Sequence, residues 1–171
     1  MIQIREALDA DWPALWAVLE PTFRRGDTYT YTYPPDVTEE EARHSWMKVP
    51  THTFVACNEE GTVLGTYVIR ANQPGQGAHV SNCGYVVSEA ARGLGVASAL
   101  CEHSQQQALR MGFLAMQFNF VVSTNERAVQ LWQRMGFAIV GTLPGAFRHP
   151  QHGFVDAFVM FKQLQPLPGA A

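Results

Sequence analysis

The sequence predicts a mixed α/β (α+β) fold whose elements follow the order β-α-α-β-β-β-α-β-α-β-β. Two observations predict it. Short apolar stretches typical of strands alternate along the chain with longer stretches in which apolar residues recur at helical spacing. Residues 80–122 have the pattern of a strand, a helix and a second strand, as in a right-handed crossover. At 171 residues, 47% hydrophobic and 16% charged, the chain suits one domain with a sizeable core.

The first elements are a short strand and two helices. Residues 2–5 alternate between apolar and polar, as in a strand. Asp9 is the expected N-cap of a helix whose apolar stripe lies within residues 12–19, and Pro21 and Gly26 mark its end. Thr38 with Glu41 then forms a capping box for a short helix through Trp46. The strands that follow are expected at residues 53–57, 63–70 and 80–87.

The second half continues with a helix expected over 92–110, which Gly112 ends. A strongly apolar strand is expected over 113–122, and Ser123 with Glu126 indicates a second capping box for a helix to Met135. The last two strands are expected at residues 137–140 and 154–161. We expect a single domain over residues 1–162 and a flexible tail over residues 163–171.

The most informative stretch is the glycine-rich turn before the helix at 92–110. Gly93 and Gly95 lack Cβ atoms, so a ligand can approach the backbone closely. The first N–H groups of a helix have no intrahelical partners, and with the helix dipole they suit a diphosphate. A P-loop is excluded because no Gly-Lys-Ser/Thr string is present, and Ser98 stands where a dinucleotide fingerprint needs glycine or alanine. A capped helix with glycines for close packing is the alternative.

Two stretches resemble the GNAT superfamily of N-acetyltransferases. Arg92-Gly93-Leu94-Gly95-Val96-Ala97 fits the Gln/Arg-x-x-Gly-x-Gly/Ala motif of that superfamily, and residues 125–137 are similar to its Asn-x-x-Ala-x-x-Leu-Tyr-x-x-x-Gly-Phe stretch. The chain looks closest to phosphinothricin acetyltransferase-like and proline-analogue acetyltransferase-like members. The resemblance implies a largely antiparallel central sheet of six to seven strands flanked by about four helices, with acetyl-coenzyme A as co-substrate.

The resemblance also implies which residues contact acetyl-coenzyme A. Three groups are implied, one for the diphosphate and two for the pantetheine arm. They are the amides of Arg92, Gly93, Leu94, Gly95, Val96 and Ala97 for the diphosphate, the strand edge Tyr85, Val86 and Val87 for the arm, and Asn125 and Trp132 beside it. A plain helix start at Asn125 and core packing of Trp132 are the alternatives.

The implied reaction is direct attack of a neutral amine on the thioester carbonyl, with a main-chain amide near Val87 stabilising the oxyanion. Trp132 replaces the tyrosine that many members use as general acid, and its indole N–H is no practical acid. Asn82 stands where some relatives carry a glutamate base, so it is expected to orient the amine or a substrate carboxylate. The candidates for the base are His79, Glu89, Asp156 and a water molecule held between Asn82 and Asn119.

Two segments are expected to select the acceptor. Residues 27–35 alternate tyrosine with other residues, which places Tyr29, Tyr31 and Tyr33 on one side of an extended segment. An edge strand or a subunit contact is the alternative for this segment. A loop between the last two strands would carry Arg148, which could pair with a substrate carboxylate. A solvated loop is the alternative, and no metal site is expected because the His149-x-x-His152 pair lacks a third ligand.

Composition narrows the remaining classes. A net charge of -3 argues against a nucleic-acid surface, and no apolar run is long enough for a membrane span. Cys57, Cys83 and Cys101 are widely spaced and odd in number, which favours thiols in a reducing cytoplasm. We therefore expect a cytoplasmic enzyme that acts on a small-molecule amine. The sequence leaves the oligomeric state open, and the resemblance implies a homodimer as one option, because relatives commonly dimerise. A noncatalytic acyl-coenzyme A sensor and a protein or peptide N-acetyltransferase are the alternatives.

Overall fold

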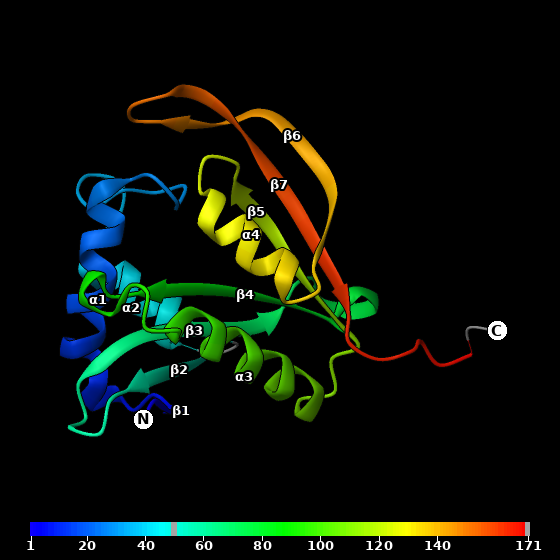
Figure 1. Cartoon of the computed structure of the whole chain (residues 1–171), viewed down its shortest axis with the longest axis horizontal. Coiled ribbons are helices and arrows are strands. Elements are labelled where there is room, and N and C mark those ends of the chain that lie inside the picture. The colour runs from blue at the N-terminus through cyan, green and yellow to red at the C-terminus, as the bar shows by residue number, and fades with distance from the viewer. Residues whose placement is uncertain (49–50, 170–171) are drawn as a thin grey trace. The chain divides into compact units, whose positions relative to one another are not determined.

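The structure is a computed structural model that describes residues 1–48 and 51–169 (Figure 1). Its strands and helices occur in the order that the sequence predicts. They are β1 (Gln3–Glu6), α1 (Trp12–Arg25), α2 (Glu39–Met47), β2 (His52–Cys57), β3 (Val63–Ala71), β4 (Val80–Val87), α3 (Val96–Arg110), β5 (Ala115–Val122), α4 (Glu126–Arg134), β6 (Ala138–His149) and β7 (Gly153–Gln163). Within the described residues, no helix has the length and apolar character that a membrane span needs.

The seven strands form one sheet in the order β1-β2-β3-β4-β5-β7-β6. β1 pairs with β2, β5 with β7 and β6 with β7 in antiparallel register, whereas β4 and β5 are parallel. A parallel pair needs a long crossover connection, and helix α3 provides it. The expected mixed, mostly antiparallel sheet with four helices is thereby confirmed.

Contacts divide the chain into two compact units. Unit 1 comprises Met1–Val68 and Gly84–Cys101, and unit 2 comprises Ile69–Cys83 and Glu102–Ala171. The boundaries fall inside β3, β4 and α3 rather than in linkers. Each unit has its own buried residues, and the single domain expected over residues 1–162 stays a prediction.

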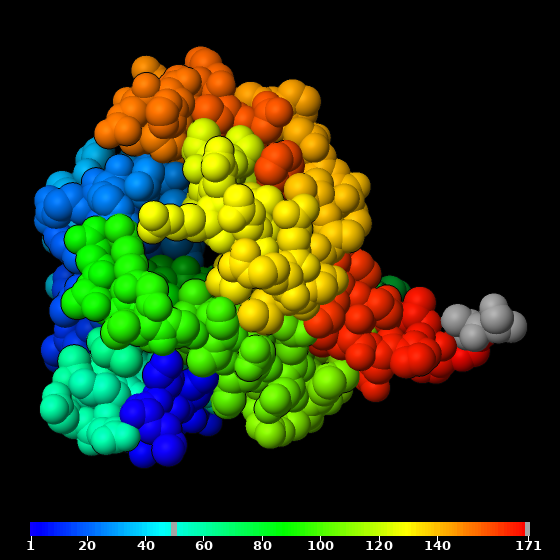
Figure 2. All heavy atoms as spheres, in the orientation of Figure 1, coloured from blue at the N-terminus to red at the C-terminus, as the bar shows by residue number. Residues whose placement is uncertain are grey.

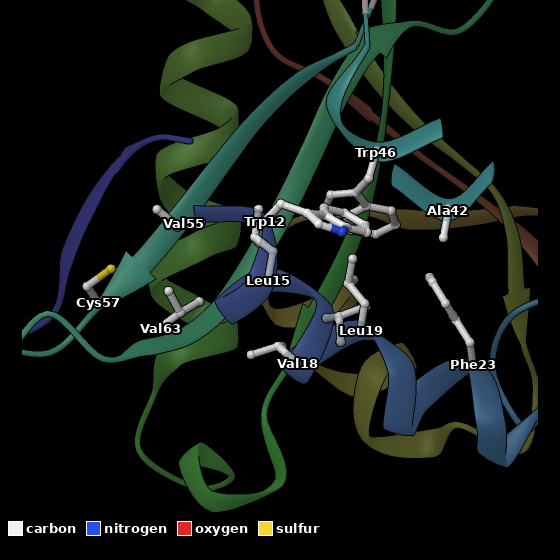
Figure 3. Packing of buried hydrophobic residues seen from close by; sticks show 11 residues of the cluster. Trp12, Leu15, Val18, Leu19, Phe23, Ala42, Trp46, Val55, Cys57 and Val63 are labelled. Atoms are coloured by element: carbon white, nitrogen blue, oxygen red, sulfur yellow. The ribbon is translucent and has the colours of Figure 1, made fainter. Parts of the chain in front are cut away.

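The core of unit 1 forms around the apolar stripe of α1 (Figure 3). Leu15, Leu19 and Phe23 are fully buried, and they lie against Trp46 of α2 and residues of β2 and β3. The helix runs through Pro21 to Arg25, so of the two residues expected to mark its end Pro21 is wrong and Gly26 is confirmed. Proline removes only one backbone donor, and the buried side chains before and after it hold the helix together. Gly26, at φ 60°, ends the helix, and its N–H donates to the Thr22 carbonyl.

The tyrosine-rich segment after α1 is a series of bends and turns rather than the expected extended segment. The rings of Tyr29 and Tyr31 pack on Phe23 with centroid distances of 5.3 and 5.0 Å, and Tyr33 packs on Trp16 at 5.0 Å. All three contacts are edge-to-face, one of the arrangements that aromatic pairs prefer. The three rings thus face the same core, as the alternation predicts, although the backbone is not a strand.

The core of unit 2 lies between β5 and α4. Phe118 on β5 contacts Trp132 of α4 at a centroid distance of 5.1 Å and stacks on Phe137 at 4.3 Å. Alternation along β5 places Gln117 and Asn119 on the opposite face of the sheet. Helix α4 begins one residue after Asn125, whose side chain accepts from the Ala128 N–H, so the expected capping box at Ser123 is wrong.

Lys162 on β7 ties three elements of unit 2 together. Its ammonium group donates to the Met135 carbonyl just after α4 at 2.7 Å and to the Gln105 side chain on α3. The same nitrogen lies 6.0 Å from the centroid of the Phe137 ring. Because carbonyls at a helix C-terminus lack intrahelical partners, this cation stabilises the end of α4.

We expect Lys162→Met to lower the free energy of unfolding by about 1–3 kcal/mol, since the Met135 carbonyl and the Gln105 amide lose a charged donor. Urea denaturation of the purified variant measures this change. Lys48→Met serves as the control, because Lys48 is exposed and is the other lysine of the sequence. Equal stability of the two variants would contradict the structural role of Lys162.

The last two strands form a much longer hairpin than expected. Strand β6 runs from Ala138 to His149 and β7 from Gly153 to Gln163, with Arg148 opposite Phe154 in register. Arg148 therefore lies on a strand, and the expected loop around it is wrong. Pairing with β7 holds this part of β6, whose Pro144 and Gly145 lack strand propensity. The first residues after β7 are bonded to the segment before β5, because the Leu164 and Gln165 N–H groups donate to the Leu114 carbonyl.

Candidate acetyl-transfer site

The glycine-rich turn lies in unit 1, between β4 and α3. Gly93 and Gly95 adopt φ values of 82° and 79°, in the left-handed region that side chains disfavour. Two left-handed residues cannot belong to an α-helix, so α3 begins at Val96 and the helix start expected at Arg92 is wrong. The segment before Val96 is therefore a separate turn that requires glycine at both positions, and it is not the first turn of the helix.

The main-chain amides of this turn are of two kinds. The Arg92 and Leu94 N–H groups donate within the turn, to the carbonyls of Glu89 and Ala91 at 3.2 and 3.3 Å. The first bond into α3 runs from the Ala99 N–H to the Gly95 carbonyl at 3.0 Å. The amides of residues 96–98 therefore precede the first intrahelical bond, where a helix presents its donors to an anion.

The space over the turn is open. A Cβ built on Gly93 or on Gly95 would meet no described atom within 4 Å beyond the adjacent residues. Residues 92–95 are exposed, and the green atoms of this segment lie at the surface in Figure 2. The glycines are therefore not needed for close packing against the rest of the chain, which was the alternative explanation for them. The backbone itself is what a ligand could approach.

Four charged side chains line up beside the turn. Arg25, at the end of α1, donates to Glu89 Oε1 at 2.8 Å, and Arg92 donates to the same oxygen at 3.3 Å. The Arg25 Nε atom also lies 3.4 Å from Asp27 Oδ2, while Oδ1 of Asp27 is buried without a hydrogen-bond partner among the described residues. Two guanidinium groups and two carboxylates thus leave the side chains of this ionic network without net charge.

The end of β4 is fastened to the tyrosine-rich segment of unit 1. The Tyr29 hydroxyl donates to the Tyr85 carbonyl at 3.2 Å, and it would lie 3.2 Å from a Cβ built on Gly84. Burial raises the pKa of Tyr29, so its hydroxyl keeps its proton and remains a donor. Val86 is buried, whereas Tyr85 and Val87 are half-buried. Tyr29 therefore helps to hold the strand edge expected to meet a cofactor.

A row of carboxamide side chains lies in unit 2. Asn82 on β4 is opposite Gln117 on β5 and donates to its main-chain carbonyl at 2.9 Å. The Gln117 amide donates to Asn119 Oδ1 at 2.8 Å, and the Asn119 amide donates to Asn72 Oδ1 at 2.6 Å. The structure thus brings the predicted residues Asn82 and Asn119 into one hydrogen-bonded row, through Gln117, which carries no titratable group.

Two further predicted residues, His79 and Arg148, lie at the surface. His79 precedes β4, is exposed, and its Nδ1 atom lies 3.2 Å from the Gln76 carbonyl oxygen. Arg148 is exposed on β6. The His149 ring accepts from the Gln151 and His152 N–H groups at 3.1 and 3.3 Å, which fixes the turn after β6. In the described ranges, no three His, Cys, Asp or Glu side chains gather as a metal site would require.

Asp156, one of the candidate bases, has a structural role. Its carboxylate accepts from the Gly145 N–H at 2.8 Å, and its carbonyl accepts from the Ser123 N–H at 2.9 Å. Asn125 caps α4, and Trp132 is 8% exposed against Phe118, so both side chains have the structural contacts weighed as alternatives. A cap side chain and a ring edge can still contact a ligand, and their cofactor roles stay predictions.

Arg25, Asp27, Gln117 and Asn72 escaped prediction, and Glu89 was expected only as a candidate base. Arg25 and Glu89 are separated by 64 positions, and Gln117 and Asn72 join the carboxamide row from different elements. No sequence spacing links such pairs. For Gln117 a signal existed, because a polar residue inside the apolar strand 113–122, two positions before Asn119, indicates a polar sheet face.

Comparisons with known proteins agree on one family. Residues 4–137 match the model of the Acetyltransferase (GNAT) family. The chain is 32% identical to N-acetyltransferase aca1 of Schizosaccharomyces pombe over 146 residues, which cover 75% of this chain and 70% of the relative. The solved structure of a GCN5-related N-acetyltransferase from Kribbella flavida has a TM-score of 0.89 at 46% identity, covering 95% and 97% of the two chains.

A more distant structure shares the fold. The phosphinothricin acetyltransferase (Pat) from Sinorhizobium meliloti, solved in complex with AcCoA, has a TM-score of 0.83 at 21% identity. The similarity covers 98% of this chain and 94% of that protein. At this identity, the similarity speaks for the fold alone.

Proposed function

Because the chain belongs to the acetyltransferase (GNAT) family, we propose that it moves an acetyl group from acetyl-coenzyme A to the amine of a small molecule, such as an amino acid or an analogue. The observation that carries the proposal is the open, left-handed turn at Gly93 and Gly95 directly before α3. Such a turn presents main-chain N–H donors to an anion, and no side chain at the two glycine positions blocks the approach of that anion.

The cofactor side of the site is built from unit 1. The amides of Gly93, Gly95, Val96 and Ala97 hold the diphosphate, whereas the main-chain amides of Arg92 and Leu94 chiefly close the turn through their own hydrogen bonds. The strand edge 85–87 pairs with the pantetheine arm, as an added strand would. Acetyl-coenzyme A supplies the thioester carbonyl and a thiolate leaving group. Asn125 and Trp132 are further residues that we propose for contacts to the arm.

The acceptor side of the proposal uses neutral groups. Asn82 orients the attacking amine with its carbonyl oxygen, since its amide is engaged by Gln117. Asn119 extends this polar surface, and we propose Tyr29 and Tyr31 as further residues for acceptor selection. Arg148 binds a carboxylate of the acceptor, and His79 removes the amine proton. We propose that the enzyme acts in the cytoplasm as a homodimer and uses no metal, because direct amine attack on a thioester requires none.

Thiol release tests the proposal. The purified chain is incubated with acetyl-coenzyme A and with amino acids, sulfoximines, cyclic imino acids, polyamines or a short peptide with a free α-amine. We expect release with at least one small amine and formation of its N-acetyl product by mass spectrometry. Binding of coenzyme A without release for any amine would favour the sensor, and release with the peptide alone would favour the peptide acetyltransferase.

A further inference from the structure

We propose that the Glu89 carboxylate competes with the cofactor diphosphate for Arg92. Glu89 holds the Arg92 side chain beside the glycine turn, and Arg92 moves from Glu89 to the diphosphate when coenzyme A binds. The inference rests on the proposed function, because it assigns a role at the same diphosphate site. It follows from the side-chain contacts of the ionic network, which joins Arg25, Glu89, Arg92 and Asp27.

The two arginines are held with unequal strength. The Arg25 side chain is 32% exposed, and it contacts Glu89, Asp27 and the Thr22 hydroxyl, the last at 3.3 Å. The Arg92 side chain is 51% exposed, and within the described residues its ion pair is with Glu89. Arg25 therefore anchors the Glu89 carboxylate, whereas Arg92 can leave it without disturbing the fold.

The exchange has a small cost. Exposed ion pairs contribute about 0–1 kcal/mol to stability, and the Arg92–Glu89 contact of 3.3 Å joins two side chains that are more than half exposed. A diphosphate offers Arg92 more acceptor oxygens than one carboxylate does, and it can be bound in a bidentate manner. Arg92 immediately precedes Gly93, so its guanidinium is attached to the turn that presents the amides.

Glu89 also opposes binding through its charge. The side chains of the network sum to zero, since Arg25 and Arg92 are balanced by Glu89 and Asp27. The attraction for the diphosphate therefore comes from main-chain donors and the helix dipole until Arg92 is released. Glu89 thus tunes affinity downward, which favours exchange of the cofactor after each turnover.

The test measures the dissociation constant of coenzyme A by titration calorimetry. In Glu89→Gln the glutamine oxygen can still accept from Arg25, but the charge is removed, and we expect about three- to tenfold tighter binding at low salt. The gain should shrink at 1 M salt, where charges are screened. Glu60→Gln, in the turn between β2 and β3, removes the same charge at an exposed site and should leave the affinity unchanged.

A second background tests the exchange itself. If Glu89 competes for Arg92, the gain from Glu89→Gln should be smaller when Arg92 is already replaced by glutamine. An equal gain in both backgrounds would overturn the exchange, and unchanged or weaker binding by Glu89→Gln would overturn the role of Glu89. Failure of the wild-type chain to bind coenzyme A would overturn the proposed function together with this inference.

Discussion

Replacing Gly95 with valine is expected to weaken coenzyme A binding more than 100-fold, to below detection by calorimetry, and to abolish thiol release. Gly95 has a φ of 79°, and a β-branched residue in this backbone conformation costs about 1–3 kcal/mol of conformational strain. The valine side chain would also occupy the open space over the turn, within reach of the amides that precede the first bond of α3. Both effects remove the diphosphate site while the rest of unit 1 stays folded.

Gly61→Val separates the loss of the site from the cost of strain. Gly61 ends the turn between β2 and β3 at a φ of 82°, and a Cβ there also meets nothing within 4 Å. We expect the two variants to lose similar stability on thermal unfolding, since they force valine into the same backbone conformation. Only Gly95→Val should lose coenzyme A. Retained affinity in Gly95→Val, or an equal loss in Gly61→Val, would refute the placement of the cofactor.

Much of the fold was predictable because burial leaves a periodic trace in the sequence. The stripe of α1, the capping box at Thr38 and the apolar run of β5 each report a local pattern that the structure confirms. β6 was underestimated because residues 138–149 are mostly exposed, so no alternation marks them. Its pairing with β7 decides the conformation there, and such a tertiary contact overrides weak local propensity.

The candidate site was predictable where a single segment builds it. The glycines at 93 and 95 mark the turn by themselves, although periodicity placed the helix start four residues too early. The ionic network and the carboxamide row were out of reach, because each joins residues from elements that only folding brings together. Asn82 illustrates the difference, since its position on the strand was predicted but its bond to Gln117 was not.

Replacing Asn82 with alanine is expected to lower turnover by about 10- to 100-fold, a loss typical of a misplaced reacting group, while the affinity for coenzyme A changes less than about twofold. The amide of Asn82 donates to Gln117, so its carbonyl oxygen is directed by that bond and is available to an amine. Alanine removes both groups. Steady-state kinetics with the best amine, together with calorimetry on coenzyme A, measures the two effects separately.

Ser81→Ala provides the matched control, because the Ser81 hydroxyl also donates to a main-chain carbonyl of β5, that of Ala115, at 3.1 Å. Ser81 is fully buried on the other face of β4, so its loss imitates the structural part of Asn82→Ala without touching the carboxamide row. Both variants should lose about 1 kcal/mol of stability, as a lost hydrogen bond does. If Ser81→Ala slows turnover as much as Asn82→Ala, strand pairing rather than amine orientation explains the effect. Comparable losses of turnover and cofactor affinity in Asn82→Ala would likewise remove Asn82 from the acceptor side.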